Sequence, residues 1–354
     1  MKGVVLSGGK GSRLRPFTYT GAKQLVPIAN KPILFYALEH LVAAGIQDIC
    51  IIVGETGDQI KTAVGDGALL GARMTYIEQS APLGIAHAVG LARDFVGQDR
   101  FVVFLGDNFI LGGIQPFVES FQATGQNCQI LLHEVTNPSD FGVVALKDGR
   151  IVSIQEKPKT PPSNLAIVGI YMFDSSVFDA IDHIRPSWRN EMEITDAIRY
   201  LLENGRKVGH QVLATPWIDT GKRDDLLNAN RLILASMAAR NEGTVDAETR
   251  VTGAVVIQNG ARVEKSVLHG PCIIGEKTIV RNSRIGPYTS IYHDCRVEGS
   301  KVDNCIVLEH SSILDTPGRV TESVIGRYVE VSRSTHRPAA SKLVLGDHSK
   351  VEFR

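Results

Sequence analysis

The chain has 354 residues, of which 43% are hydrophobic, and its 38 basic residues balance its 38 acidic residues. A chain of this size can bury one large core or two smaller ones, so we expect a globular protein of two domains. The balanced charge and the absence of roughly 18 uninterrupted apolar residues argue against nucleic-acid and membrane partners and predict a cytoplasmic enzyme.

Residues 1 to about 240 alternate short β-branched runs with longer amphipathic stretches. This alternation predicts βαβ units around a largely parallel sheet, and therefore a first domain over residues 1–240. The strands are expected at residues 4–6, 49–53, 101–105 and 129–132. The helices are expected at residues 32–44, 59–64, 85–95, 114–123 and 224–240.

The periodicity changes after residue 240. Residues 241–244 are polar and are expected to form a linker. Beyond them, aliphatic residues recur every six positions in shifting registers: Val251, Ile257 and Val263; then Val267, Ile273, Ile279, Ile285, Ile291 and Val297; then Val307 with Ile313 and Ile325 with Val331. A period of six predicts a hexapeptide parallel β-helix over residues 245–354, with a β-sandwich as the alternative.

The first expected strand leads into a glycine-rich loop at residues 6–16 (LSGGKGSRLRP). Glycines let backbone N–H groups approach phosphate oxygens, and Lys10, Arg13 and Arg15 add positive charge. The loop has Leu14 where a dinucleotide fingerprint needs glycine, and it lacks the Gly-Lys-Ser/Thr of a Walker A loop. Alone, the pattern is compatible with a phosphate-binding loop or with a simple tight turn.

Further motifs follow the loop in order at residues 22–32 (AKQLVPIANKP), 78–88 (EQSAPLGIAHA), 105–108 (LGDN), 140–144 (DFGVV), 156–158 (EKP), 191–196 (EMEITD) and 217–221 (WIDTG). Together with the loop they resemble the signature of the sugar-1-phosphate nucleotidyltransferases, which make nucleoside-diphosphate sugars. The PLGIAHA and EMEITD forms are most similar to long-form glucose-1-phosphate thymidylyltransferases. Ser12 stands where threonine is commoner in the family.

This resemblance implies an α/β fold class: a Rossmann-like nucleotidyltransferase domain with a mostly parallel mixed sheet, followed by a C-terminal left-handed parallel β-helix. It implies in-line attack by glucose 1-phosphate on the α-phosphate of dTTP, giving dTDP-glucose and pyrophosphate. Both reactants are anions, so catalysis would come from charge neutralisation and positioning. UTP, another nucleoside triphosphate or another hexose 1-phosphate stays open as the substrate.

The resemblance also implies roles for individual residues. Arg13 would hold the leaving pyrophosphate and Lys23 the α-phosphate, while Asp107 and Asp219 would bind Mg²⁺ through hard oxygen ligands. With Lys157, these four are the expected catalytic residues. The expected nucleotide-binding residues are Leu6, Gly8, Gly9, Gly11, Ser12, Arg13, Gln79, Pro82 and Gly84. The expected sugar-phosphate-binding residues are Asn108, Gly142, Glu156, Lys157, Val168, Gly169 and Trp217.

Two other functions remain alternatives. His269, His293 and His310 lie in the repeat region, where a histidine could serve acyl transfer or could simply be a solvated corner residue. A silent regulatory paralogue is the other alternative, and the intact Arg13 and Lys23 speak against it. The β-helix is expected to support a homo-oligomer, with a trimer and a tetramer as the candidate states. The five widely spaced cysteines are expected to be buried and reduced.

Overall fold

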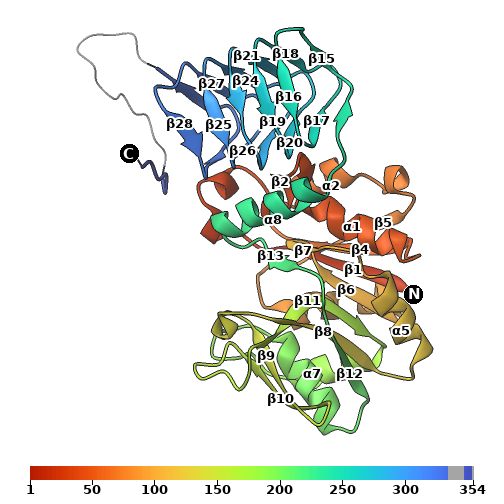
Figure 1. Cartoon of the computed structure of the whole chain (residues 1–354). Coiled ribbons are helices and arrows are strands. Elements are labelled where there is room, and N and C mark those ends of the chain that lie inside the picture. The colour runs from red at the N-terminus through yellow and green to blue at the C-terminus, as the bar shows by residue number, and fades with distance from the viewer. Residues whose placement is uncertain (334–346, 353–354) are drawn as a thin grey trace. The chain divides into compact units, whose positions relative to one another are not determined.

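The computed structural model describes residues 1–333 and 347–352, and its contacts divide the chain into two compact units (Figure 1). Segments distant in sequence contribute to each unit. Unit 1 comprises Met1–Lys10, Gly21–Leu25 and Ile33–Asp219, and unit 2 comprises Gly11–Thr20, Val26–Pro32 and Thr220–Arg354. The domain boundary expected between residues 240 and 245 stays a prediction. No helix in the described residues is long and apolar enough to cross a membrane.

Unit 1 is built around a nine-stranded mixed sheet. Strands β6, β1, β4 and β5 pair in parallel, as do β8 and β12, while β11 runs antiparallel between β6 and β8. The expected Rossmann-like mixed sheet is therefore confirmed. Its strands are β1 (Lys2–Ser7), β4 (Asp48–Val53), β5 (Arg73–Glu78), β6 (Phe101–Leu105), β8 (Cys128–Glu134), β9 (Gly142–Lys147), β10 (Arg150–Glu156), β11 (Leu165–Phe173) and β12 (Val208–Val212).

Helices cover both faces of this sheet because neighbouring side chains of a strand point to opposite faces. Val4 of β1 belongs to the core on one face, with α3 (Ile85–Leu91), α4 (Arg93–Val96), α6 (Ser176–His183) and α7 (Ile194–Glu203). Val5 belongs to the core on the other face, with α1 (Ile33–Ala43), α2 (Gly57–Val64) and α5 (Gln115–Ala123). The unit is thus a three-layer α/β/α fold.

Short elements complete the region before residue 240. Five 3₁₀ turns are present: η1 (Ser12–Leu14), η2 (Phe17–Tyr19), η3 (Lys23–Leu25), η4 (Ala68–Leu70) and η5 (Pro138–Asp140). In unit 1, β7 (Asn108–Ile110) pairs with β13 (Trp217–Asp219), and in unit 2, β2 (Pro27–Ile28) pairs with β3 (Lys31–Pro32). The expected helix over 85–95 is divided at Ala92 between α3 and α4. The last helix, α8 (Arg223–Ser236), ends before its predicted end at 240, because Met237 is extended.

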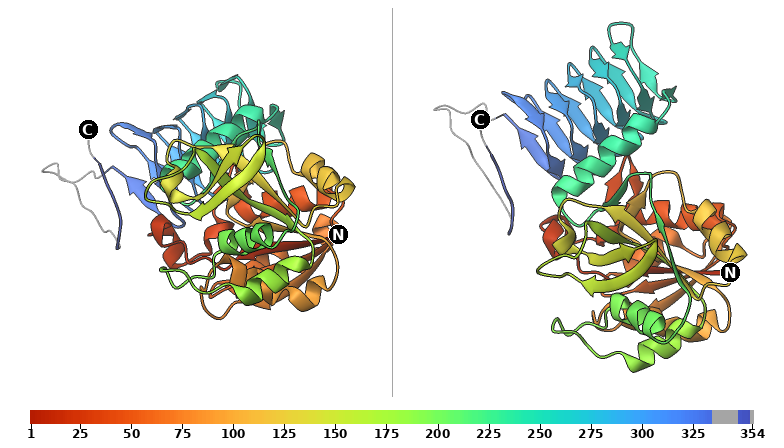
Figure 2. Two further views of the ribbon diagram at one scale, coloured as in Figure 1. Left: turned by 90° about the horizontal axis from the view of Figure 1, so that it is seen from below. Right: turned by 60° about the horizontal axis from the view of Figure 1, so that its bottom comes forward.

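Unit 2 contains a left-handed parallel β-helix, whose coils appear in Figure 2 as a stack of short parallel strands. Its three sheets pair one coil with the next. The first sheet holds β14 (Arg240–Asn241), β17 (Val255–Ile257), β20 (Cys272–Ile274), β23 (Thr289–Ile291), β26 (Ile306–Val307) and β29 (Val324–Ile325). The second holds β15 (Thr244–Val245), β18 (Arg262–Glu264), β21 (Ile279–Arg281), β24 (Arg296–Glu298), β27 (Ser312–Leu314) and β30 (Glu330–Ser332). The third holds β16 (Arg250–Thr252), β19 (Val267–His269), β22 (Arg284–Ile285), β25 (Lys301–Asp303) and β28 (Arg319–Thr321).

Two expectations about this region are wrong in detail. The polar segment 241–244 is not a linker, since Asn241 and Thr244 already lie in strands that pair with the following coil. Val251 and Val267 are 44% and 37% exposed rather than in the core. Leu268 takes the inward position instead, and it pairs with Ile285 seventeen residues later, so a strict spacing of six drifts out of register.

Candidate functional site

A cavity of about 140 Å³ in unit 1 gathers most of the residues expected to bind the sugar phosphate. The expected residues that line it are Asn108, Gly142, Glu156, Lys157, Gly169, Trp217 and Asp219. Phe141, Glu193 and Thr195, which were not among the expected residues, line it too. Val168 is different, because its side chain is fully buried in the core. Its predicted role in binding is untested.

Asn108 and Trp217, which line this cavity, belong to a network of polar side chains. The ammonium of Lys23, which is 6% exposed, pairs with the carboxylate of Asp107 at the end of β6. Asn108 donates to Asp107 Oδ1 over 2.9 Å, and Trp217 Nε1 donates to Asn108 Oδ1 over 2.7 Å. Burial raises the pKa of Asp107, but attraction to Lys23 and the hydrogen bonds outweigh burial and hold that pKa below its ordinary value. Asp107 is therefore ionised at neutral pH.

The second expected metal ligand, Asp219, reaches the same place through a strand pair. β13 runs antiparallel to β7, and in this register Asp219 stands opposite Asn108, the neighbour of Asp107. The fold therefore brings together two carboxylates that are distant in sequence. These are hard oxygen donors, the type that Mg²⁺ and similar cations prefer, so the residues present fit a divalent cation.

Glu156, at the end of β10, forms the acidic side of the cavity. Thr195 Oγ1 donates to its Oε2 over 3.1 Å, and Gly142 pairs with it across the hairpin of β9 and β10. Burial and the nearby Glu193 raise the pKa of the Glu156 carboxyl, and Lys157, Thr195 and Arg189 only partly oppose them. A Cβ on Gly142 would lie 2.7 Å from Thr195 Cγ2, so glycine is required there by close packing.

Lys157 supplies positive charge next to Glu156. Its backbone adopts the left-handed conformation, with φ of 40°, and its N–H donates to Phe141 O over 3.0 Å. The Phe141 ring meets the ring of Trp217 edge to face at 5.3 Å. Non-glycine residues in this conformation are uncommon and cluster at functional sites, which supports a binding role for Lys157.

Arg189 is a cation that the sequence analysis missed. Its guanidinium lies 3.5 Å from Glu156 Oε1, 2.8 Å from Glu191 Oε1 and 3.4 Å from Glu193 Oε1. Glu193 is 3% exposed and also accepts a hydrogen bond from Ser187 Oγ. The signal was available, since Arg189 stands two residues before the EMEITD motif, but its nearness to Glu156 requires the tertiary fold.

Several of the expected nucleotide-binding residues of unit 1 lie at and around the end of β1. Gly8 lies close to Gln79, since a Cβ on Gly8 would meet Gln79 Oε1 at 3.2 Å. The Gln79 amide Nε2 lies 3.3 Å from Gly84 O and 3.0 Å from His87 Nδ1. Leu6 is partly buried, while Gly9 and Pro82 are exposed. The structure thus brings Gly8, Gln79 and Gly84 together.

Two buried oxygens near this loop have no hydrogen-bond partner among the described residues: Ser7 Oγ and Gln24 Oε1. Both side chains are at most 2% exposed. Buried polar atoms are normally satisfied, so two orphaned oxygens at a glycine-rich turn support a binding role for this end of β1.

Backbone conformation and close packing require glycine at position 84, independently of any contact with a nucleotide base. Its φ is 104°, and a Cβ there would lie 2.4 Å from Met192 O. Met192 N donates to Leu83 O over 2.7 Å, and Ala86 N donates to Met192 O over 3.0 Å. The PLG segment and the EMEITD motif are therefore fastened together by backbone hydrogen bonds.

Gly11, Ser12 and Arg13 belong to unit 2 and are described there. Gly11 is left-handed, with φ of 63°, and its carbonyl accepts from Leu14 N over 2.9 Å and from Thr18 Oγ1 over 2.7 Å. Arg13 lies near enough to Asp225 of α8 for their charges to interact. The roles expected for Gly11, Ser12 and Arg13 stay predictions.

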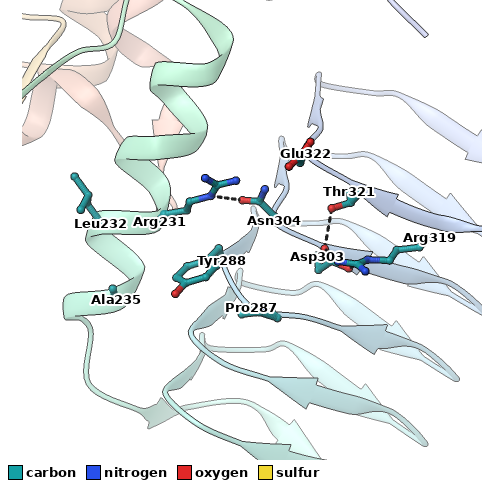
Figure 3. A pocket seen from close by; sticks show the side chains of 10 residues that line it. All are labelled: Arg231, Leu232, Ala235, Pro287, Tyr288, Asp303, Asn304, Arg319, Thr321 and Glu322. Atoms are coloured by element: carbon teal, nitrogen blue, oxygen red, sulfur yellow. Dashed lines mark hydrogen bonds and ion pairs between the residues drawn. The ribbon is translucent and has the colours of Figure 1, made fainter. Parts of the chain in front are cut away.

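A larger cavity, about 540 Å³, lies in unit 2 between α8 and the β-helix (Figure 3). Several of its polar side chains contact one another: Arg231 Nε donates to Asn304 Oδ1 over 2.8 Å, and Arg319 pairs with Asp303. Thr321 Oγ1 also donates to Asp303, over 2.8 Å. None of the expected site residues lines this cavity, so the smaller cavity of unit 1 is the better candidate active site.

Strand-end carboxylates, a buried lysine and a glycine-rich turn at the carboxyl ends of parallel strands together define an α/β enzyme that binds anionic nucleotides. Comparison with known proteins identifies the family. Residues 2–236 match the family "Nucleotidyl transferase". The chain belongs to this nucleotidyl transferase family, whose members generally use a divalent metal.

The chain is 50% identical to a glucose-1-phosphate thymidylyltransferase of Streptomyces antibioticus, and the match covers all of both chains. It is 44% identical, again over all of both chains, to the low-salt glycan biosynthesis nucleotidyltransferase Agl11 of Haloferax volcanii. A Bacillus anthracis protein described as a glucose-1-phosphate thymidylyltransferase, solved with sucrose, has a TM-score of 0.63 and 40% identity. That match covers 66% of this chain and 94% of the other.

Proposed function

We propose that the chain transfers the nucleoside monophosphate of dTTP to glucose 1-phosphate, giving dTDP-glucose and pyrophosphate. The main support is that one cavity combines Glu156, Lys157 and Trp217 with two further residues. These are Asp219 and Asn108, which is next to Asp107 in the sequence. A relative that is 50% identical over its full length has this activity in its name.

In this proposal the cavity binds the hexose phosphate. Glu156 accepts hydrogen bonds from sugar hydroxyls, and Gly142 and Gly169 let the ring approach the backbone. Lys157 binds the phosphate, and Arg189 adds a second positive charge beside Glu156. Trp217 and Phe141 form the apolar wall, and Asn108, held by Trp217, is a polar group for a further hydroxyl.

The reaction joins two anions, so the protein must neutralise charge and align the reacting groups. The sugar phosphate oxygen attacks the α-phosphorus, a P–O bond forms, and the bond to the pyrophosphate oxygen breaks. Lys23 is buried beside the carboxylate of Asp107, where it stabilises the charge that develops on the α-phosphate. Both reactants are held directly, so no covalent intermediate is needed.

Asp107 and Asp219 would hold Mg²⁺, which supplies neutralising charge to the triphosphate. Gln79 would read the base edge, with Leu6, Gly8, Pro82 and Gly84 forming its surroundings. The remaining loop residues Gly9, Gly11, Ser12 and Arg13 are proposed to bind the β- and γ-phosphates. These assignments rest on the motifs and on the contacts of Gly8 and Gln79 within unit 1.

The test is pyrophosphate release by the full chain with Mg²⁺ and a panel of nucleoside triphosphates and hexose 1-phosphates. We expect dTTP with glucose 1-phosphate to give the highest kcat/KM. Asp107→Asn should reduce turnover by roughly 10²-fold or more while the protein stays folded. No release with any pair in the panel would contradict the proposal, and a preference for UTP would correct the base.

We also propose that residues 1–240 carry out catalysis and that residues 245–354 mediate assembly. The β-helix exposes Val267 and Tyr328, at 37% and 75%, which favours a contact with another copy. We expect light scattering of the full chain to show a homo-oligomer, with a trimer and a tetramer as the candidate states. A monomer at all working concentrations would refute this part of the proposal.

A further inference from the structure

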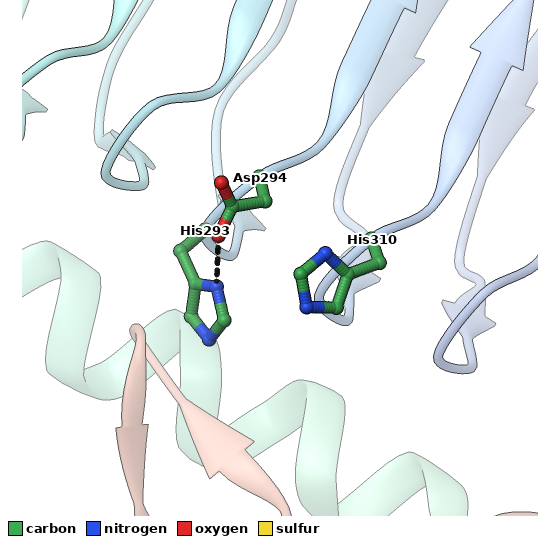
Figure 4. A group of neighbouring side chains, drawn as sticks. All are labelled: His293, Asp294 and His310. Atoms are coloured by element: carbon green, nitrogen blue, oxygen red, sulfur yellow. Dashed lines mark hydrogen bonds and ion pairs between the residues drawn. The ribbon is translucent and has the colours of Figure 1, made fainter.

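His293, Asp294 and His310 gather at one corner of the β-helix (Figure 4). Each offers one metal-ligand atom, and these atoms all lie within 4.8 Å of one another. In the described parts of the chain, this is the one group of three or more histidine, cysteine or acidic side chains with that spacing. None of the three takes part in the function proposed above.

The coil register explains why they meet. β23 pairs with β26 so that Ser290 stands beside Ile306, and continuing this register sets Asp294 beside His310. Both residues are left-handed, with φ of 55° and 59°, which marks the same corner in successive coils. His310 N donates to His293 O over 3.3 Å, so backbone pairing between coils holds the corner together.

Neighbouring rings orient the two imidazoles. His310 stacks on Tyr328 with centroids 4.9 Å apart, and His293 lies 4.4 Å from the ring of Tyr292. His293 Nδ1 is 2.8 Å from Asp294 Oδ2. The three side chains are partly or fully exposed, so an ion in solution can reach them.

Charged side chains lie near this corner, and one of them competes for the Asp294 carboxylate. Glu309, which precedes His310, is engaged by Arg327 at 2.5 Å and is not needed as a ligand. Lys277 is the nearby cation that interacts with Asp294, and it would compete for that carboxylate. The three groups are open to solvent.

We propose that His293, Asp294 and His310 bind a late first-row divalent transition metal, of which Zn²⁺ is the reference, and that the ion cross-links two coils of the β-helix. Zinc bonds of about 2.0–2.2 Å in a tetrahedron set ligand atoms about 3.4 Å apart. The observed spacing, from 2.8 Å to at most 4.8 Å, brackets that value, and exposed side chains adjust by small rotations. Two imidazoles favour such ions over Mg²⁺ or Ca²⁺.

Calorimetric titration of the full chain with ZnCl₂ tests the proposal, with excess Mg²⁺ present to occupy sites made of oxygen ligands. We expect one Zn²⁺ site per chain that is lost in the double variant His293→Gln/His310→Gln. Loss of one of the two imidazoles should weaken Zn²⁺ binding by at least roughly 10-fold, because even the loss of a residue that only hydrogen-bonds to a metal ligand costs that much. His269→Gln is the matched control, because it removes a histidine of the same β-helix outside the group, and it should keep the site.

Electron paramagnetic resonance with Cu²⁺ gives a second measurement that a change in fold cannot imitate. The wild-type chain should show coupling to two imidazole nitrogens, and His310→Gln should show one. Circular dichroism and unchanged pyrophosphate release would establish that the variants are folded. Equal Zn²⁺ binding by wild type and the double variant, or a Cu²⁺ signal without imidazole coupling, would overturn the proposal.

Discussion

Glu156 shows at the scale of one residue how a group proposed to bind substrate acts against stability. Burial and Glu193 raise its pKa above the ordinary 4.5, so the folded protein holds the proton more tightly than the unfolded chain. The stability this gives is fully present below the unfolded pKa and is lost as pH rises through the folded pKa. At neutral pH the ionised Glu156 is therefore a destabilising group, which its proposed role toward sugar hydroxyls would explain.

The first prediction concerns the pH dependence of sugar binding. As pH falls from neutral, Glu156 should take up a proton at a higher pH than an ordinary glutamic acid, and kcat/KM for glucose 1-phosphate should fall. The sugar phosphate titrates too, so the useful quantity is the ratio of wild type to Glu156→Gln at each pH. This ratio should decline through the raised pKa; a ratio that stays constant down to pH 4.5 would contradict it.

The second prediction uses the close approach at Gly142. A methyl group there would lie 2.7 Å from Thr195 Cγ2 and 3.2 Å from Glu156 Oε2. Gly142→Ala should displace Glu156 and lower kcat/KM for glucose 1-phosphate by roughly 10²-fold, the effect of about 1 Å of misplacement. The KM for dTTP should change little. Gly125→Ala is the control, because a Cβ at Gly125 meets nothing within 4 Å. An equal loss of kcat/KM in both variants would contradict the prediction.

The candidate site was predictable from sequence where a residue belongs to a local motif. Asp107 follows the buried strand β6, and Glu156 and Lys157 lie at the end of the half-exposed strand β10. Strand ends are where open α/β sheets bind ligands. The contacts of Arg189 and Thr195 with Glu156 were not predicted, although Thr195 lies in the EMEITD motif, since these contacts depend on the tertiary fold. Val168 belongs to none of these motifs, its side chain lies in the core, and its predicted role stays untested.

At the scale of elements, the β-helix core between Val263 and Val302 follows spacings of six, six and five residues rather than a constant six. The inward residues Val263, Leu268, Ile274, Val280, Ile285, Ile291, Val297 and Val302 are all buried. Leu268 pairs with Ile285 and Ile285 with Val302, which gives seventeen residues in each of these coils. Periodicity alone predicted the architecture, but a strict period cannot show where a corner is one residue shorter.

The third prediction tests this register with two neighbouring residues. Leu268→Ala should destabilise unit 2 by about 2–5 kcal/mol, because Leu268 is fully buried. Val267→Ala should change stability by no more than about 0.5–1 kcal/mol, since Val267 is 37% exposed. The urea midpoint of unfolding measures the stability of both variants, with the labelling of Cys272 as the signal for unfolding of unit 2. If Val267→Ala had the larger effect, the spacing of six from the sequence analysis would be right and the observed register wrong.

At the scale of the whole molecule, the five cysteines report on both units. All are free and buried, as the sequence analysis expected. Burial raises the pKa of the Cys50, Cys272 and Cys305 thiols to about 12, and that of Cys295 to about 11. The reactive thiolate is therefore scarce at neutral pH, and a thiol reagent should label none of them while the chain is folded.

The last prediction is that these thiols become reactive in two groups as urea increases. Cys50 and Cys128 lie in the core of unit 1, while Cys272, Cys295 and Cys305 lie in the core of the β-helix. Each core should open as one cooperative step, because it is a single packed cluster, and units with separate cores need not open together. Pulse labelling with mass spectrometry should show thiols of one core appearing together, and Leu268→Ala should move only the β-helix group to lower urea. Labelling that mixes thiols of the two cores within each step would show that the chain unfolds as one body.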